Sequence, residues 1–329
     1  MAYTTIDDPS AYFQVTLYTG DGSTTNAITN GGNSDLQPDM VWLKDRGAAN
    51  WHSITDVARG HSKAIFPNED DAEDSSNAYV KAFNSDGFTL GSAGSDVNAN
   101  NNTYVSWQWK ESATSGFDIV TFTGNQTART ISHSLSAKPE WLWIKNREKV
   151  ESWHTQHGAL GATKTAESNT TGAFGTGSTI WNDTEPTTSV FSVGNNGNIN
   201  ETGSGIVVFL WASKQGFSKF GSYSGNGNAD GAFVYTGFKP AFVMIKRTNA
   251  TSNWRIFDNK RLGYNSSNSQ SYPNLANAED TGTNLDFYSN GFKLLSTSGD
   301  INNGSGTYIY MAFAEQPFVT STGVPATAR

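Results

Sequence analysis

Three tryptophans are the residues of this sequence that could most directly bind a ligand. Trp51, Trp153 and Trp254 stand at matching places, each after a short apolar run that begins near a proline. Sugars stack on exposed aromatic faces, so the three indoles are candidates for contacting a glycan. The alternative is that each ring plugs the open end of its own sandwich of strands. Recurrence in every copy favours this packing role, because binding sites usually diverge between copies.

A carboxylate and a guanidinium three residues apart could act as a catalytic acid steadied by a cation. Asp56 and Arg59 have this spacing, and the pair recurs as Asp258 and Arg261. The corresponding place between them holds His157, so the pattern does not require the pair, and a turn-stabilising ion pair is favoured. A carbohydrate-cleaving enzyme would need two carboxylates facing each other across a cleft. Asp56 and Asp258 are candidates, but no pairing is evident.

Metal ligation has two candidate segments. His154 and His157 follow a predicted strand, where residues i and i+3 point to opposite sides, which disfavours a shared zinc ion. The segment Asn68–Asn77 holds five carboxylates but lacks the alternating ligands and central glycine of a calcium loop, so a solvated loop is favoured. Neither a phosphate-binding glycine loop nor a nucleophile elbow is present. The sequence therefore predicts no catalytic residue, no metal site and no cofactor.

The elements that carry these residues recur along the chain. The motif PDMVWLKDRG begins at Pro38 and returns in altered form at Pro139 and Pro240, at a constant interval (139 − 38 = 101 and 240 − 139 = 101). A period of about 100 residues is too long for a solenoid repeat and is the size of a small domain. The chain is therefore predicted to contain three tandem copies of one domain.

Strand patterns dominate each copy, and helix signals are nearly absent. The runs Met40–Leu43, Trp141–Ile144 and Phe242–Ile245 are apolar at every position, which suits strands covered on both faces. In the last strand of each copy, one set of alternate residues is large and apolar and is predicted to face the core: Val105, Trp107, Trp109, Val207, Phe209, Trp211, Ile309, Met311 and Phe313. The other set in the first copy is predicted to face solvent: Tyr104, Ser106 and Gln108.

Seven or eight strands per copy predict an all-β fold of three tandem β-sandwich repeats, similar to jelly rolls, with almost no helix. The expected bounds are an N-terminal arm (1–11), three repeats (12–112, 113–214 and 215–318) and a C-terminal tail (319–329). The linkers are only a few residues long, so neighbouring repeats should touch, in a compact chain or a stiff rod. The arm and the tail are expected to order only against a partner.

Composition narrows the partners. The 329 residues include no cysteine and carry a net charge of −8, which disfavours disulfides, thiolate chemistry and binding to nucleic acid. The first residues lack the basic start and apolar stretch of a signal peptide. The longest apolar run, Ile206–Ala212, is much shorter than the roughly 20 residues of a membrane span. The sequence therefore predicts a soluble chain with no membrane insertion.

The repeated motifs resemble a known family. PDMVWLKDRG, then DGFTLGS and YVSWQWKE, and then a restart at GFDIVTFTGN are similar to an uncharacterised repeat domain of about 100 residues in structural proteins of tailed bacteriophages, especially marine ones. The resemblance covers about residues 12 to 317. It implies a virion component with a β-sandwich fold and no established catalytic residues, so none is carried over.

These expectations combine into a non-enzymatic virion protein on the particle surface, assembled in the host cytoplasm. The leading hypothesis is a tail appendage or fibre-type component that engages the host. A capsid decoration protein is the alternative, because three copies could mimic a local three-fold axis. A glycan-binding module and a surface depolymerase are further alternatives. The expected partners are other virion proteins and a host surface glycan or receptor, with a homotrimer as the default on symmetry grounds.

Overall fold

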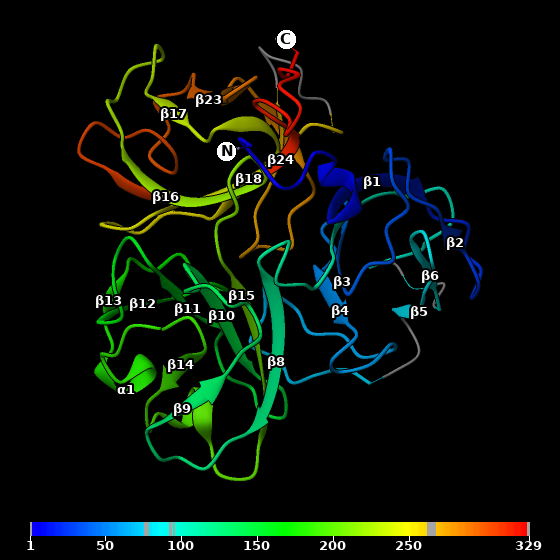
Figure 1. Ribbon diagram of the computed structural model, residues 1–329. Helices are drawn as coiled ribbons and strands as arrows, with labels where there is room; N and C mark the ends of the chain where they lie inside the picture. The colour runs from blue at the N-terminus through cyan, green and yellow to red at the C-terminus, as the bar shows by residue number, and fades with distance from the viewer. Residues whose placement is uncertain (1, 76–78, 92–93, 95, 262–267, 328–329) are drawn as a thin grey trace.

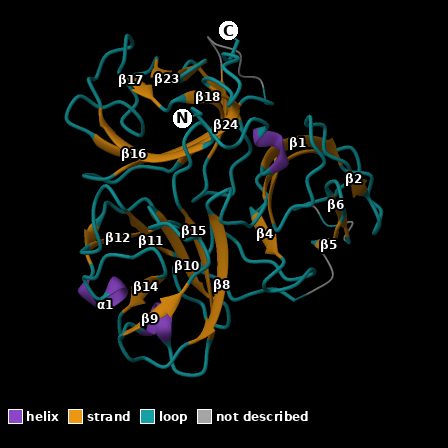
Figure 2. Ribbon diagram, in the orientation of Figure 1, coloured by secondary structure: helices purple, strands orange, loops and turns teal. Residues whose placement is uncertain are grey.

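The fold is known from a computed structural model (Figure 1), which describes residues 2–75, 79–91, 94, 96–261 and 268–327. Strands account for 41% of the chain and helices for 4% (Figure 2). The paired strands run antiparallel to each other. This confirms the predicted all-β sandwich class. Three main sheets and three smaller sheets are present among these residues.

The first unit consists of one main sheet and one smaller sheet. Its main sheet has the order β1–β7–β3–β4, formed by Phe13–Thr19, Thr103–Trp109, Met40–Asp45 and Ser53–Asp56. Its smaller sheet has the order β2–β6–β5, formed by Ala27–Ile28, Phe88–Leu90 and Val80–Phe83. A short 3-10 helix, η1 (Pro9–Ala11), precedes β1 and is capped by the side chain of Asp8.

The second unit has the same plan with two added edge strands. Its main sheet has the order β13–β12–β11–β10–β15–β8, formed by Gly175–Thr176, Lys164–Glu167, His154–His157, Trp141–Asn146, Gly205–Trp211 and Phe117–Thr123. Its smaller sheet pairs β14 (Val190–Val193) with β9 (Arg129–Ser132). The helices α1 (Ser178–Trp181) and α2 (Gly197–Asn200) lie in this unit, and within the described ranges no helix is long and apolar enough to cross a membrane.

The third unit has the order β16–β24–β18–β19–β20–β21 in its main sheet, formed by Ser218–Ser224, Thr307–Pro317, Phe238–Arg247, Arg255–Asp258, Asn268–Ser271 and Asp280–Gly282. Its smaller sheet has the order β17–β23–β22, formed by Phe233–Tyr235, Gly291–Leu294 and Leu285–Tyr288. All three main sheets thus share four neighbouring strands in the same order. The residue bounds drawn from the sequence for three copies stay a prediction.

The inner faces of the three main sheets pack on one another in one shared core. The ring centroids of Trp42 and Trp143 are 5.3 Å apart, those of Trp141 and Trp254 6.0 Å, and Trp107 contacts the third unit in the same way. The large apolar set predicted to face the core lies here and is buried, as expected. Figure 1 shows the three units around a common centre, so the compact arrangement holds and the stiff rod is wrong.

The outer face of each main sheet is covered by the smaller sheet of the same unit. The prediction that Tyr104, Ser106 and Gln108 face solvent is therefore wrong, since all three are fully buried. The Gln108 side-chain amide donates to Asn30 Oδ1 at 2.6 Å and to Thr16 Oγ1 at 3.3 Å. Polar residues at this face satisfy one another beneath the smaller sheet, and their polarity misled the assignment.

The lysine of the repeated motif has a structural role. Lys44, Lys145 and Lys246 are fully buried, and burial lowers the pKa of each to about 8. The Lys44 ammonium donates to the carbonyls of Asp45 at 2.6 Å and Ala48 at 3.1 Å, and the other two make similar bonds. Each lysine therefore fixes the loop that follows its strand, which explains why a lysine follows the apolar run in every copy of the motif.

Backbone hydrogen bonds connect the three units in a closed ring. In each case a loop of one unit donates an N–H to the carbonyl at or just after the end of the apolar strand in the next unit. The pairs are Glu73 with Arg147 (2.7 Å), Phe174 with Thr248 (3.0 Å) and Glu279 with Arg46 (2.9 Å). The first unit thus contacts the second, the second the third, and the third the first. Ion pairs between Glu73 and Arg147 and between Glu279 and Arg46 reinforce two of these contacts.

The terminal segments lie against the third unit. The Tyr3 hydroxyl donates to the Gly237 carbonyl at 2.6 Å, and Ile6 is buried in the shared core. Asp7 accepts the Ser321 N–H at 2.6 Å, so the two ends contact each other. The expectation that arm and tail order only against a partner is wrong for the described residues, because the chain supplies its own apolar and polar contacts there.

Candidate functional site

The three candidate tryptophans do not share one environment. Trp51 is 37% exposed, whereas Trp153 and Trp254 are 0% and 1% exposed and lie in the shared core. Strand register also shows that Trp51 does not occupy the position that Trp153 and Trp254 occupy in the second and third units. The backbone N–H groups of His52, Trp153 and Trp254 are each bound by an asparagine side chain: Asn68, Asn169 and Asn274. His52 is therefore the counterpart of Trp153 and Trp254, and Trp51 was matched by residue type alone.

These counterpart positions join neighbouring units. The Trp42 indole N–H donates to His52 Nδ1 at 3.0 Å, and His52 Nε2 lies 3.1 Å from the Tyr272 carbonyl of the third unit. Nε2 therefore carries the proton, and burial lowers the pKa of His52 well below its usual value. The Trp153 indole N–H donates to the Phe66 carbonyl of the first unit at 2.9 Å. Packing between units is the role that these contacts support.

The two Asp–Arg pairs are buried ion pairs within turns, as predicted. Asp56 and Arg59 are 2.5 Å apart and Asp258 and Arg261 2.7 Å, with both members of each pair fully inaccessible. Each aspartate also accepts the backbone N–H of its arginine, which closes the turn after the strand. The Trp107 indole N–H donates to Asp258 at 3.1 Å. Both carboxylates are therefore engaged by arginines and structural donors.

The two metal candidates also lie in contacts between elements. His154 and His157 are both buried on β11, and burial lowers the pKa of each to about 4. In the acidic segment, Glu73 pairs with Arg59 and Arg147, so this part of the loop contacts the second unit and is not simply solvated. Residues 76 and 77 of that segment lie outside the described residues.

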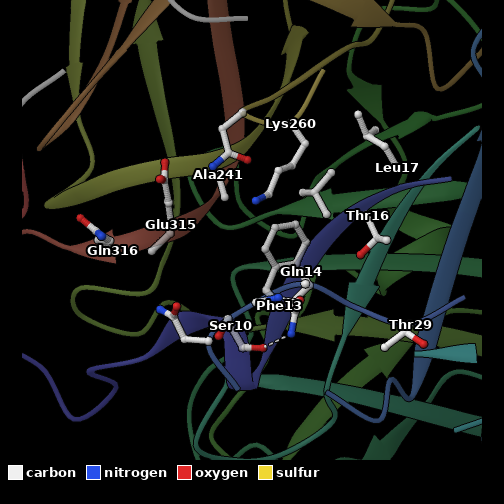
Figure 3. A pocket seen from close by; sticks show the side chains of 16 residues that line it. Ser10, Phe13, Gln14, Thr16, Leu17, Thr29, Ala241, Lys260, Glu315 and Gln316 are labelled. Carbon is white, nitrogen blue, oxygen red and sulfur yellow. Dashed lines mark hydrogen bonds between the residues drawn. The ribbon is translucent and has the colours of Figure 1, made fainter. Parts of the chain in front are cut away.

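A pocket of about 470 Å³ lies where β1 of the first unit meets the third unit (Figure 3). Its walls are Phe13 to Leu17 of β1, the segment around Gly32 that follows β2, and Ala241, Lys260 and Glu315 of the third unit. Figure 3 shows the Lys260 side chain extending from the third unit toward β1. The pocket is thus a junction between two units and not the interior of one sandwich.

Backbone polar groups of β1 face this pocket. The Tyr12 carbonyl accepts from Lys110 N–H at 2.9 Å, and Gly20 N–H donates to Asn102 at 2.8 Å. Because hydrogen-bonding direction alternates along an antiparallel strand, the even-numbered residues between them bind β7. Odd-numbered residues such as Val15 therefore direct N–H and C=O away from the sheet, into the pocket. The strand is an unpaired sheet edge at this place.

Two polar side chains that line the pocket, Gln14 and Asn259, differ in their hydrogen bonding. Gln14 is engaged by its own unit, with its amide N–H groups donating to the Ser10 and Ser34 carbonyls at 2.9 Å (Figure 3). Asn259 is 5% exposed, and its Oδ1 has no hydrogen-bond partner within the described part of the chain. Sequence reasoning missed this pocket, because nothing in the local pattern indicates that the first unit packs against the third.

A group of exposed aromatic rings covers the outer face of the smaller sheet in the third unit, here called the aromatic face. It consists of Phe233, Tyr235 and Tyr288, which are 47%, 48% and 37% exposed. The rings of Phe233 and Tyr288 are 5.9 Å apart, and strand register places Lys293 beside Phe233. Apolar rings next to charged groups on a rigid sheet are typical of an interaction surface.

Comparison with known proteins gives one family. No curated protein matches the chain. A family model described as a domain of unknown function, DUF7483, matches residues 8–317. The match begins just before η1 and ends with the last residue of β24, so it takes in all three main sheets. The chain is a member of the DUF7483 family.

Proposed function

We propose that this protein is a non-enzymatic structural component of a bacteriophage particle, located at the particle surface in a tail appendage that contacts the host. The resemblance of the repeated motifs to phage structural proteins supports the virion assignment. The aromatic face carries the host-contact part of the proposal, since it exposes three rings on one sheet. The smaller sheet of the first unit has Ala27 at the register position of Phe233, so the shared architecture does not require an aromatic ring there.

The proposed ligand of the aromatic face is a surface polysaccharide of the host. Sugar rings present C–H faces that stack on Phe233 and Tyr288, while hydroxyl groups hydrogen-bond to Lys293 and Asp286 beside them. The Lys219 ammonium lies 5.3 Å from the Tyr235 ring centroid and orients that ring. Trp51 provides a second exposed aromatic group on the first unit.

A glycan array of bacterial lipopolysaccharides and capsular polysaccharides tests the proposal. The wild-type protein should bind a subset of these polysaccharides, and the double substitution Phe233→Ala with Tyr288→Ala should weaken binding at least tenfold. Val150→Ala is the matched control, because Val150 is a highly exposed apolar residue of the second unit. Equal binding by both variants would remove the aromatic face from the proposal.

Capsid decoration is the second candidate, and the closed ring of three units favours it. One chain offers three similar sheets around a common centre, which suits a site where capsid subunits meet around a local three-fold axis. Electron cryomicroscopy of intact particles distinguishes the candidates, because density on the tail supports an appendage and density across the capsid lattice supports decoration. For the appendage we propose a homotrimer, and light scattering against the 35.5 kDa chain mass checks it.

A further inference from the structure

The three junctions between units differ at one corresponding backbone group. Val15, Ile119 and Phe220 occupy the same register position, opposite Trp107, Phe209 and Met311 in the three main sheets. All three direct their N–H away from the sheet.

Two of these edge groups are capped by the linkers that join the units. The Ile119 N–H donates to the Glu111 carboxylate at 3.4 Å, in the linker between the first and second units. The Phe220 N–H donates to the Ser213 hydroxyl at 3.3 Å, in the linker between the second and third units. At both places the chain itself supplies an oxygen acceptor to the edge strand.

The third junction has no linker, and its edge is open. Glu315 occupies the place that corresponds to Glu111, but β24 continues to Pro317 along β18, and Glu315 pairs with Lys239 at 3.4 Å. Within the described ranges, no side chain caps the N–H of Val15. The pocket of about 470 Å³ occupies this place.

The walls of the pocket specify what would fill it. Asn259 presents a buried, unpartnered Oδ1, which needs an N–H donor. Lys260 is exposed and makes no ion pair with any described residue, so it favours a carboxylate. The free edge of β1 needs N–H and C=O groups at strand spacing, which an extended peptide provides.

The pocket also continues beyond β1. A second cavity of about 230 Å³, between the two terminal segments, shares Asn33, Glu315 and Gln316 with it. Neither cavity is closed, so a peptide added to β1 would not be confined to the first one.

We propose that this open junction is a docking site for an extended, acidic peptide segment of a partner protein. The segment adds a strand to the free edge of β1, its carbonyl accepts the Val15 N–H, its N–H satisfies Asn259, and its carboxylate pairs with Lys260. The site lies on a different surface from the aromatic face and does not depend on glycan binding.

Two synthetic strand peptides test the proposal on the full chain by fluorescence anisotropy. The acidic probe alternates valine or threonine with glutamate, and the control probe carries lysine in place of each glutamate. The acidic probe should bind at least tenfold more tightly, and its binding should slow hydrogen exchange at the amides of Val15 and Leu17. Failure of the acidic probe to bind, or equal binding of both probes, would overturn the proposal.

Variants locate the binding. Lys260→Glu should weaken the acidic probe at least tenfold, whereas Lys81→Glu, an exposed lysine on the smaller sheet of the first unit, should leave it unchanged. Val15→Pro removes the edge N–H while keeping the bonds to β7, and should also weaken binding. Binding that survives both Lys260→Glu and Val15→Pro would place the peptide elsewhere. Displacement of the probe by an uncharged oligosaccharide would instead assign the pocket to a sugar.

Discussion

Histidine side chains are held neutral inside this fold. Burial lowers the pKa of His154 and of His157 to about 4, while an unfolded histidine titrates near 6.5. Below about pH 6.5 the unfolded chain therefore binds more protons than the folded one. These residues contribute stability that is present at neutral pH and is lost as the pH falls from about 6.5 toward 4.

Replacement of His154 by phenylalanine should reduce this acid sensitivity. Both ring nitrogens of His154 lack a partner in the described part of the chain, so the substitution also removes two unsatisfied polar atoms. We expect the free energy of unfolding at pH 5 to rise by about 2 kcal/mol more than at pH 7. Urea unfolding at the two pH values measures this. The partly exposed His133→Phe is the control, and an unchanged pH dependence in His154→Phe would contradict the neutral assignment.

The buried ion pair of Asp258 and Arg261 should be costly to break from one side. Asp258→Asn removes the nearer of the two carboxylates that pair with the buried guanidinium and leaves only Glu279 at 3.5 Å, which costs roughly 3 kcal/mol of unfolding free energy. Lys138→Ala, which breaks the half-exposed pair of Lys138 and Glu185, should cost less than about 1 kcal/mol. Guanidinium chloride unfolding compares the two. Similar losses in both variants would contradict the structural role of the buried pair.

At the scale of elements, the linker between the first and second units contains a titratable residue, Glu111, whose carboxylate caps the Ile119 N–H. Burial and the neighbouring Asp118 raise the pKa of Glu111 to about 7, although the Ile119 N–H opposes the shift. The unfolded glutamate loses its proton first, near pH 4.5, so the folded state loses stability as the pH rises from about 4.5 to 7. This dependence is opposite in sign to that of the buried histidines.

Glu111→Gln should remove this part of the pH dependence while the side-chain carbonyl still accepts the Ile119 N–H. We expect the melting temperature of the variant to exceed that of the wild type by about 2 °C at pH 8 and to match it at pH 4.5. Differential scanning fluorimetry across this range measures both. A variant that is less stable at pH 8 would show that the ionised carboxylate is the better cap.

Strand patterns predicted the elements of the main sheets well, and the smaller sheets poorly. The runs that begin at Met40 and Trp141 are covered on both faces, because continuous apolar residues need two packing surfaces. Gln108 was misassigned, because a polar residue can be buried when Asn30 on a crossing segment satisfies it. Trp51 was wrongly matched to Trp153 and Trp254, because the shared residue type concealed a shift of one residue in strand register. Long-range pairing decided both cases, and local sequence does not encode it.

At the scale of the molecule, one core serves all three units, and the chain should unfold in one transition. Trp42 and Trp141 each contact a tryptophan of another unit, so loss of one unit exposes the core of its neighbours. Differential scanning calorimetry should give a single peak. Residues 113–214 expressed alone should be unfolded or aggregated, since Trp141, Trp143 and Trp153 would be exposed. Three resolved peaks, or a folded fragment, would contradict the shared core.

The open junction could not be predicted from any one segment. It depends on the first and third units meeting, and β1 and Lys260 are far apart in the sequence. The contacts that close the ring are nevertheless visible in the sequence. Their carbonyl acceptors, Arg46, Arg147 and Thr248, recur at the interval of the repeated motif. This recurrence can be interpreted only after the ring is known, since an arginine at the end of a strand is common on any protein surface.

Because the terminal segments contact each other, the order of the units along the chain could be changed by circular permutation. Tyr3 packs against Phe318, and Asp7 binds Ser321, so a short added loop could join the two ends. If the joined chain were opened at Ala113, the circular permutant would form the same ring in the order second, third, first. The uncapped edge would stay at β1, because Glu315 is held along β24 by Lys239 and Glu111 would remain beside the Ile119 N–H.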